Sequence, residues 1–382
     1  MRFPPTSSPR ARLRRVVSLS GAALVLFGGA SCARDDVVAP SATTAPDGRF
    51  PDGTTVRLVT HDSFNVSDDV LAGFTADTGI EVEIVRGGDA VTVVNQAVLA
   101  AGRPQGDVLF GIDGNLLDAA LEADVFLPYE AEGLDQIDPA LVSDSQHRVT
   151  PVDVGDVCVN VDDEWFDEAA VAKPTSIDDL IDPTYADLLV VQDPASSTPG
   201  LAFLLATIDR FGDEGPDGGW EAWWSALDDN GVQVVAGWEE AYNGAFTAGG
   251  GGDRPLVVSY ATSPPAAVVY SDAFQADGTM PDVAPTSIIA DSCYRLVESA
   301  GILRGAEDEA AARALVDFLV SERFQADVPL SMFVEPVREG TPRPEVFERF
   351  AGVVEEPAEL APAVVAESRQ SWVETWTNLV AR

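Results

Sequence analysis

The sequence is poor in positive charge, with 23 lysine or arginine residues against 63 aspartate or glutamate residues in a chain of 382. Lys173 is the only lysine, and the formal net charge is −40. This excess of acid opposes attraction to nucleic acids and to anionic lipid surfaces, and it gives cationic ligands a mild preference. The alternative is a solvated acidic surface that has no bearing on a ligand. We expect no nucleic-acid partner.

Histidine is almost as scarce, because His61 and His147 are the only two. Metal sites and catalytic triads therefore have little to use. His61 is followed by Asp62 and Ser63, but adjacent strand residues point to opposite faces and cannot form a hydrogen-bonded relay. The glycine run at 249–252 does not open a helix after a strand, so we expect a turn and not a phosphate-binding loop. We expect no catalysis, metal or cofactor.

The N-terminal 31 residues carry five arginines and no acid, with an apolar run from Val16 to Phe27 and small residues after it. These are the parts of a secretory signal. A cysteine at the first mature position, Cys32, indicates a lipoprotein, because its thiol can carry a diacylglyceryl anchor. Gly29 stands where such signals usually have leucine, so the alternative is an ordinary cleavage nearby with Cys32 incidental. The apolar run is shorter than the roughly 20 residues of a membrane span.

We therefore expect residues 1–31 to be a signal peptide, and the mature protein to work outside the cell membrane, attached through a lipid anchor only. Residues 32–53 would carry the lipidated cysteine and a flexible tether, because they are rich in Ala, Pro, Thr, Asp and Gly without periodicity. The rest of the chain, about 330 residues, exceeds what one core usually supports, so two lobes are expected.

Only three cysteines occur in the chain. If Cys32 is lipidated, Cys158 and Cys293 remain in an exported and oxidising setting. Both stand in strand-like runs, DVCVNV and CYRLVES. We expect a disulfide between them; two separately buried thiols are the alternative.

Apolar strands alternate with helical segments through the rest of the chain, which indicates an α/β architecture with a mainly parallel sheet. Trp220, Trp223 and Trp224 recur at helical spacing and are expected in the core. The predicted strands lie at 56–60, 81–85, 107–112, 156–161, 188–193, 232–237, 255–262 and 293–303. The predicted helices lie at about 67–77, 91–101, 115–123, 201–211, 309–321 and 362–380.

Polar and aromatic side chains follow several of these strands, where open α/β sheets bind their ligands. Ser197 and Thr198 precede a proline and an apolar helix, so they can cap that helix or bind an anionic group. Trp238 at a strand-to-helix turn is a candidate platform for a flat or cationic ligand. The segments are THDSF at 60–64, RGGDAV at 86–91, GIDGN at 111–115, QDPASSTPG at 192–200 and GWEEAY at 237–242.

In this order the segments resemble the thiamine-binding lipoproteins or periplasmic proteins of bacterial ABC importers, from about residue 56 to the C-terminus. The resemblance also includes DVLFGIDGNLLDAA, VVSYATSP and QSWVETW. It implies a type II periplasmic-binding-protein fold, with two α/β lobes, crossing strands and a ligand cleft between the lobes. The crossing strands would bring the two later cysteines side by side. The lobes would be 54–153 with 298–332, and 154–297 with 333–382.

The resemblance implies ligand contacts at Asp89, Ser197, Thr198, Trp238 and the stretch Tyr260-Ala261-Thr262-Ser263-Pro264. Three positions depart from the better-known members: His61 and Ala266 stand where they have tyrosines, and Phe333 where they have a tryptophan. The aromatic cage is thinner, which leaves open whether thiamine, one of its phosphates or a related cation is preferred. The residues themselves add Asp62, Asp113 and Tyr242 as candidate contacts.

We therefore expect a monomeric solute-binding lipoprotein that captures thiamine or its phosphates and delivers the ligand to an ABC permease. The alternatives are a binding protein of the same fold for a polyamine, a ferric ion or a small anion, and an exported hydrolase. Ferric sites of this kind normally use tyrosine pairs, and this chain has no adjacent tyrosines. The acid excess argues against an anion.

Overall fold

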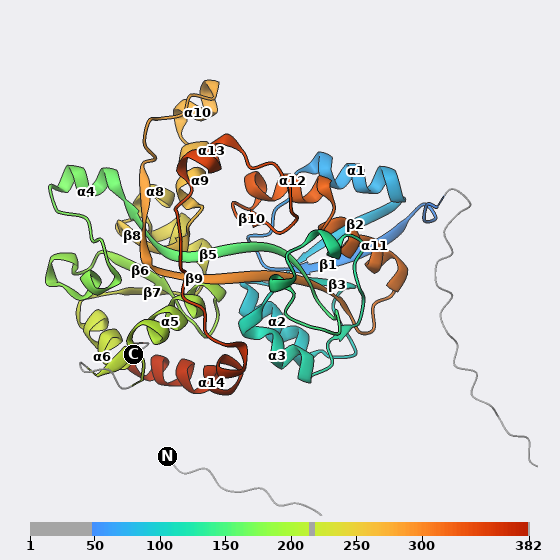
Figure 1. The fold of residues 1–382 in the computed structure, drawn as a ribbon, viewed down its shortest axis with the longest axis horizontal. Coiled ribbons are helices and arrows are strands. Elements are labelled where there is room, and N and C mark those ends of the chain that lie inside the picture. The colour runs from blue at the N-terminus through green and yellow to red at the C-terminus, as the bar shows by residue number, and fades with distance from the viewer. Residues whose placement is uncertain (1–47, 214–217, 381–382) are drawn as a thin grey trace, which may run out of the picture. The chain divides into compact units, whose positions relative to one another are not determined.

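The computed structural model describes residues 48–213 and 218–380 (Figure 1). The expected signal peptide, Cys32 and most of the expected tether lie outside these residues. Within the described end of the tether, the backbone N–H of Phe50 donates to the carbonyl of Thr78 at 2.8 Å, and the ring packs against the core. The packed part of the chain therefore includes Phe50.

One mixed sheet runs through the described chain in the order β2-β1-β3-β9-β5-β8-β6-β7, with β4 beside β9 and β10 beside β5. Parallel pairing is confined to the two outer parts, where β1 lies beside β2 and β3, and β6 beside β7 and β8. The expectation of a mainly parallel sheet is wrong for the centre, because β9 and β5 run antiparallel to their neighbours. The strands are β1 (Thr54–Thr60), β2 (Ile80–Arg86), β3 (Val108–Asp113), β4 (Phe126–Leu127), β5 (Thr150–Asp162), β6 (Leu189–Gln192), β7 (Gln233–Val235), β8 (Leu256–Tyr260), β9 (Thr286–Leu303) and β10 (Glu335–Pro336).

The central strands β5 and β9 are the longest, at 13 and 18 residues, and they cross the middle of the view in Figure 1. β5 is buried along almost its whole length, including its polar residues Asp153, Asn160 and Asp162. β9 begins at Thr286, well before the predicted start at Cys293, because its first residues pair with the end of β5. The two strands thus connect the part of the sheet that holds β1 to the part that holds β6.

Helices pack on both faces of the sheet and enclose separate apolar clusters. One cluster joins α2, α3, α5, α6 and α14, and it includes the edge-to-face pair of Trp224 and Trp376 at 5.4 Å. Trp220, Trp223 and Trp224 are buried there, so their assignment to the core is confirmed. A second cluster joins α1, α11 and α12. In the described ranges no helix combines the length and the apolar character that a bilayer crossing needs.

The predicted helices at about 67–77, 91–101, 115–123, 201–211, 309–321 and 362–380 are confirmed, and several shorter helices were not predicted. The helices are α1 (Asp68–Thr78), α2 (Ala90–Leu99), α3 (Gly114–Glu122), α4 (Asp163–Ala169), α5 (Thr198–Phe211), α6 (Gly219–Asp229), α7 (Trp238–Glu240), α8 (Thr247–Gly250), α9 (Ser263–Val269), α10 (Asp272–Asp277), α11 (Glu309–Leu319), α12 (Glu322–Ser331), α13 (Glu345–Phe350) and α14 (Pro362–Leu379). The glycine run expected as a turn instead ends the one-turn helix α8, and Gly251 takes the positive φ of 69° that follows it. It does not precede a long helix, so it offers no phosphate loop.

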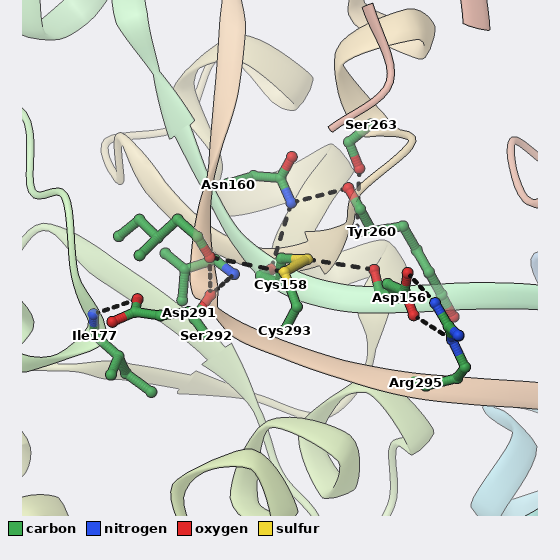
Figure 2. Close-up of a disulfide and its surroundings, with 12 residues drawn as sticks. Asp156, Cys158, Asn160, Ile177, Tyr260, Ser263, Asp291, Ser292, Cys293 and Arg295 are labelled. Atoms are coloured by element: carbon green, nitrogen blue, oxygen red, sulfur yellow. Dashed lines mark hydrogen bonds and ion pairs between the residues drawn. A yellow bond between two sulfur atoms is a disulfide. The ribbon is translucent and has the colours of Figure 1, made fainter. Parts of the chain in front are cut away.

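Cys158 on β5 and Cys293 on β9 form a disulfide, with their Cα atoms 4.2 Å apart (Figure 2). On the same two strands, the Arg295 guanidinium pairs with the Asp156 carboxylate at 2.9 Å. The Ser292 hydroxyl accepts the backbone N–H of Val159 at 2.8 Å. The disulfide therefore sits within a set of cross-strand bonds at the centre of the sheet.

Candidate functional site

A cavity of about 630 Å³ opens between the part of the sheet that carries β1 and the part that carries β8. Small-molecule sites commonly measure about 300–1,000 Å³. His61 and Asp89 line it from the first part, and Thr198, Trp238 and Tyr260 line it from the second. Most of the predicted site residues meet here, although they come from distant segments of the chain. The others among them that line the cavity are Asp62, Tyr242, Ser263 and Phe333.

Three predicted residues do not line the cavity. Asp113 is buried at the end of β3, where its carboxylate caps α3 by accepting the backbone N–H of Asn115 at 2.7 Å. Ser197 is buried and donates its hydroxyl to Asp89, which lines the cavity. Thr262 is also buried, and its hydroxyl donates to the carbonyl of Phe333. Thr262 therefore fixes the segment that carries Phe333 and does not face the cavity.

Asp89 joins the two sides of the cavity. It sits at the start of α2, and its carboxylate accepts the Ser197 hydroxyl at 3.0 Å and the backbone N–H groups of Thr198 at 3.0 Å and Trp238 at 3.4 Å. Burial raises the pKa of Asp89, although the bonds from Thr198, Ser197 and Trp238 act in the opposite direction. The N-terminus of α5, which attracts negative charge, is thus occupied by a carboxylate of the protein itself.

Trp238 forms the aromatic wall. Its ring stacks on Tyr242 with centroids 5.1 Å apart and planes 13° apart. Its Nε1–H donates to the Ser259 hydroxyl at 2.9 Å. Tyr242 is buried, and burial raises its pKa to about 12, so it remains a neutral phenol under the indole. The indole is held on one face and at its edge, and its remaining surface lines the cavity.

The Thr198 side chain lies on the same wall, at the first residue of α5. The residue is 2% exposed, and its hydroxyl has no hydrogen-bond partner among the described residues. Buried hydroxyls are usually hydrogen-bonded. The hydroxyl of Thr198 therefore has unused hydrogen-bonding capacity at this wall, although its oxygen is covered by neighbouring atoms.

The cavity also contains a carboxylate that sequence reasoning did not select. Glu298 lies inside β9, opposite Asp113 of β3 and opposite Asp153 of β5. Its Oε2 lies 3.6 Å from Nε2 of His61. No turn or motif distinguishes it, and the one available signal is a lone acid within the apolar run LVESAGIL.

His61 reaches Glu298 because the residue that faces its imidazole is a glycine, which has no side chain. Gly111 has φ of +93°, and a Cβ there would stand 2.5 Å from the imidazole Cδ2. The imidazole also lies near the Phe110 ring, with centroids 5.6 Å apart. A larger residue at 111 would displace His61 from the carboxylate.

Tyr270 is a second lining residue that the sequence did not indicate. It follows α9, and its backbone N–H donates to the carbonyl of Ala266 at 2.9 Å. Its ring lies 5.5 Å from that of Phe333, and the residue is 68% exposed although it lines the cavity. Ala266 and Tyr270 are one helical turn apart, so they reach the same side of the cavity.

No group of three or more His, Cys, Asp or Glu side chains within the described ranges is arranged to hold a metal ion. The cavity instead combines an aromatic wall, a free hydroxyl and carboxylates. Such a set suits a flat organic ligand with a positive charge.

Comparison with known proteins agrees with this chemistry. Residues 105–350 match the family of bacterial extracellular solute-binding proteins. The thiamine-binding periplasmic protein of Escherichia coli (strain K12) is 30% identical over 336 residues, covering 86% of this chain and 94% of that protein. The protein of the same name from Brucella suis biovar 1 is 28% identical over 337 residues, covering 86% and 92%.

Solved structures show the same architecture. A periplasmic thiamin binding protein superposes with a TM-score of 0.73 at 27% identity, covering 87% of this chain and 99% of that one. Iron-bound HitA from Pseudomonas aeruginosa superposes with a TM-score of 0.65 at 19% identity, covering 85% and 99%, a likeness of fold alone. The chain has the type II periplasmic-binding-protein fold.

Proposed function

The chain belongs to the family of bacterial extracellular solute-binding proteins, and on that premise we propose that its cavity captures thiamine or a thiamine phosphate for delivery to an ABC importer. The relatives named for thiamine cover most of this chain and most of their own length. The family is one of solute-binding proteins and not of enzymes. The protein would work as a monomer and without a cofactor.

The observation that carries this proposal is the indole of Trp238, held flat by Tyr242 at the wall of a cavity that also contains carboxylates. Thiamine has a flat aminopyrimidine and a thiazolium ring with a permanent positive charge. An aromatic face attracts such a cation by stacking and by cation–π attraction. A rotation of the Thr198 side chain, whose covered hydroxyl has no partner among the described residues, would supply a hydrogen bond on the same wall.

Export and anchoring complete the proposal. We infer that residues 1–31 direct export and that Cys32 carries a lipid, so that the protein works at the outer face of the cell membrane. The support is the basic and apolar leader with a cysteine after small residues. Capture at the surface would concentrate the ligand next to the permease.

Titration calorimetry of the purified protein tests the ligand. We expect thiamine or one of its phosphates to bind at micromolar concentration or below, and spermidine, ferric citrate and sulfate not to bind. Trp238→Ala should weaken binding about 30-fold, because a desolvated cation–π contact is worth ~2 kcal/mol. Trp372→Ala, on α14 and outside the lining residues, is the matched control.

Two results would contradict the proposal. If the wild-type protein binds none of the thiamine compounds at tens of micromolar, the ligand is wrong. If Trp238→Ala binds as tightly as Trp372→Ala while both melt like the wild-type protein, the stacking role is wrong.

A further inference from the structure

We propose that Glu298 is the carboxylate that meets the positive charge of the ligand, and that His61 controls by its protonation whether this carboxylate is available. The inference rests on the proposed function only in requiring a cationic ligand. It gives the charge-pairing role to Glu298 and not to Asp89, the acid among the ligand contacts that the resemblance implies.

Asp89 is poorly placed for this role, since three donors already surround its carboxylate. Hydrogen bonds from N–H and O–H groups compensate its negative charge before a ligand arrives. Asp62 also lines the cavity, but it is exposed and accepts the backbone N–H of Gly88 at 3.2 Å. Water screens a charge in that position.

Glu298 differs from Asp89 in its polar partners and from Asp62 in its exposure to water. Its side chain is 13% exposed and lines the cavity, so that water screens it little. Among the residues that the structure describes, no arginine or lysine pairs with it, and His61 is its one ion-pair partner. A ligand cation that reaches the floor of the cavity therefore meets an enclosed carboxylate without a permanent countercharge.

Asp153 is a second carboxyl group beside Glu298. It lies opposite Glu298 on β5, it is 0% exposed, and neither of its oxygens has a hydrogen-bond donor in the described chain. Burial, followed by the charge of Glu298, raises the pKa of Asp153 well above its ordinary value. When two carboxyl groups adjoin, the more deeply buried one retains the proton. Asp153 thus holds a proton, and it adds no second negative charge beside Glu298.

His61 competes with the ligand for that charge. Burial lowers the pKa of His61, but the negative charge of Glu298 3.6 Å away, with smaller effects of Asp89 and Asp62, raises it more, and the net pKa lies above the ordinary 6.5. Below this pKa the imidazolium pairs with Glu298 and repels a cation. Above it the imidazole is neutral and leaves Glu298 to the ligand. Binding should therefore tighten as pH rises, and it should release a proton when His61 starts charged.

Other titratable groups lie near His61 and Glu298, and their effect on the pH dependence of binding must be separated from that of His61. Asp113 faces Glu298 from β3, and burial raises its pKa to about 6. Tyr260 faces it from β8, and burial raises the pKa of this phenol well above its ordinary value, so it stays neutral. Ionisation of Asp113 could imitate that of His61, so Asp113→Asn is a control. The pKa of Asp89 is also raised by burial, and loss of the pH dependence in His61→Gln separates His61 from both acids.

The test is calorimetric titration with thiamine from pH 5.5 to 8.5, on the wild-type protein and on His61→Gln, Glu298→Gln and Asp113→Asn. For the wild-type protein we expect Kd to fall by up to tenfold per pH unit below the pKa of His61 and then to level off. His61→Gln should remove this dependence, and Asp113→Asn should keep it. Glu298→Gln should weaken thiamine at least tenfold at pH 8, with little effect on thiamine thiazolone, a neutral isostere.

Proton release supplies a measurement that needs no variant. Wild-type titrations near pH 6.5 in buffers of different ionisation enthalpy should show that the buffer takes up protons when thiamine binds. If binding releases no proton, the role of His61 is overturned. If the wild-type protein binds thiamine and Glu298→Gln binds it with the same Kd, the role of Glu298 is overturned and the proposed function is left intact. Absence of thiamine binding by the wild-type protein at pH 8 overturns both.

Discussion

At the scale of single residues, Tyr270 supplies an aromatic ring at the side of the cavity where Ala266 has none. Both residues line the cavity and lie one helical turn apart. Tyr270 is 68% exposed, so most of its ring has no contact within the protein. The Phe333 ring, 5.5 Å away, extends the same surface. We expect Tyr270 to cover the ligand from the mouth of the cavity.

Tyr270→Ala should therefore weaken thiamine binding by about 3- to 10-fold, since an aromatic pair contributes ~0.5–1.5 kcal/mol beyond the area it buries. Tyr270→Phe should bind like the wild-type protein. The double change Ala266→Tyr with Tyr270→Ala should recover part of the loss, because it returns a ring to the same side of the helix. Calorimetry measures all three, and full affinity in Tyr270→Ala would exclude the contact.

Residues at strand ends were predictable from the sequence, and residues inside strands were not. Asp89, Thr198 and Trp238 each follow an apolar strand, where parallel sheets place their ligands, and all line the cavity. Asp113 has the same signal, but its carboxylate turns back to cap α3. Glu298 depends on the register of β9 against β3 and β5, which no local pattern specifies.

At the scale of elements, the pairing of β5 with β9 determines how the two parts of the sheet are joined. The alternation of apolar runs predicted that both strands exist. It did not predict their antiparallel pairing or the early start of β9, because pairing partners lie far apart in the chain. The disulfide closes a separation of 135 residues across this pair.

Reduction of the Cys158–Cys293 disulfide should lower the free energy of unfolding by about 2–5 kcal/mol, because the reduced chain regains the entropy of a long loop. Denaturant unfolding with and without reductant measures the change. A double variant, Cys158→Ser with Cys293→Ser, should show the lower stability and no response to reductant. Alkylation of both cysteines in the unfolded, unreduced protein would contradict the bond.

At the scale of the whole molecule, charge and anchoring have separate roles. The chain carries −40, and the leader's five arginines account for its largest basic run, so the part from Cys32 onward carries −45. That charge repels anionic lipid. Electrostatic attraction to anionic lipid would therefore not hold the folded domain at the membrane, and the proposed lipid on Cys32 would have to do so.

The mature protein should begin at a lipidated Cys32 and sediment with membranes, because buried acyl chains contribute ~0.8 kcal/mol per CH₂. Cys32→Ala should appear in the soluble fraction with unchanged ligand affinity. Mass spectrometry of the N-terminus and fractionation check both points, and a high-salt wash that fails to release the wild-type protein is the control. An unmodified N-terminus at another residue would contradict the anchor.

The carboxylate of Asp89 at the start of α5 also affects how the protein meets its surroundings. A free helix N-terminus recruits inorganic phosphate and sulfate, which are common solutes outside cells. Here the backbone N–H of Thr198 and the hydroxyl of Ser197 already donate to Asp89. Inorganic anions find those donors occupied, so changes in the phosphate or sulfate content of the medium should have little effect on ligand binding in the cavity.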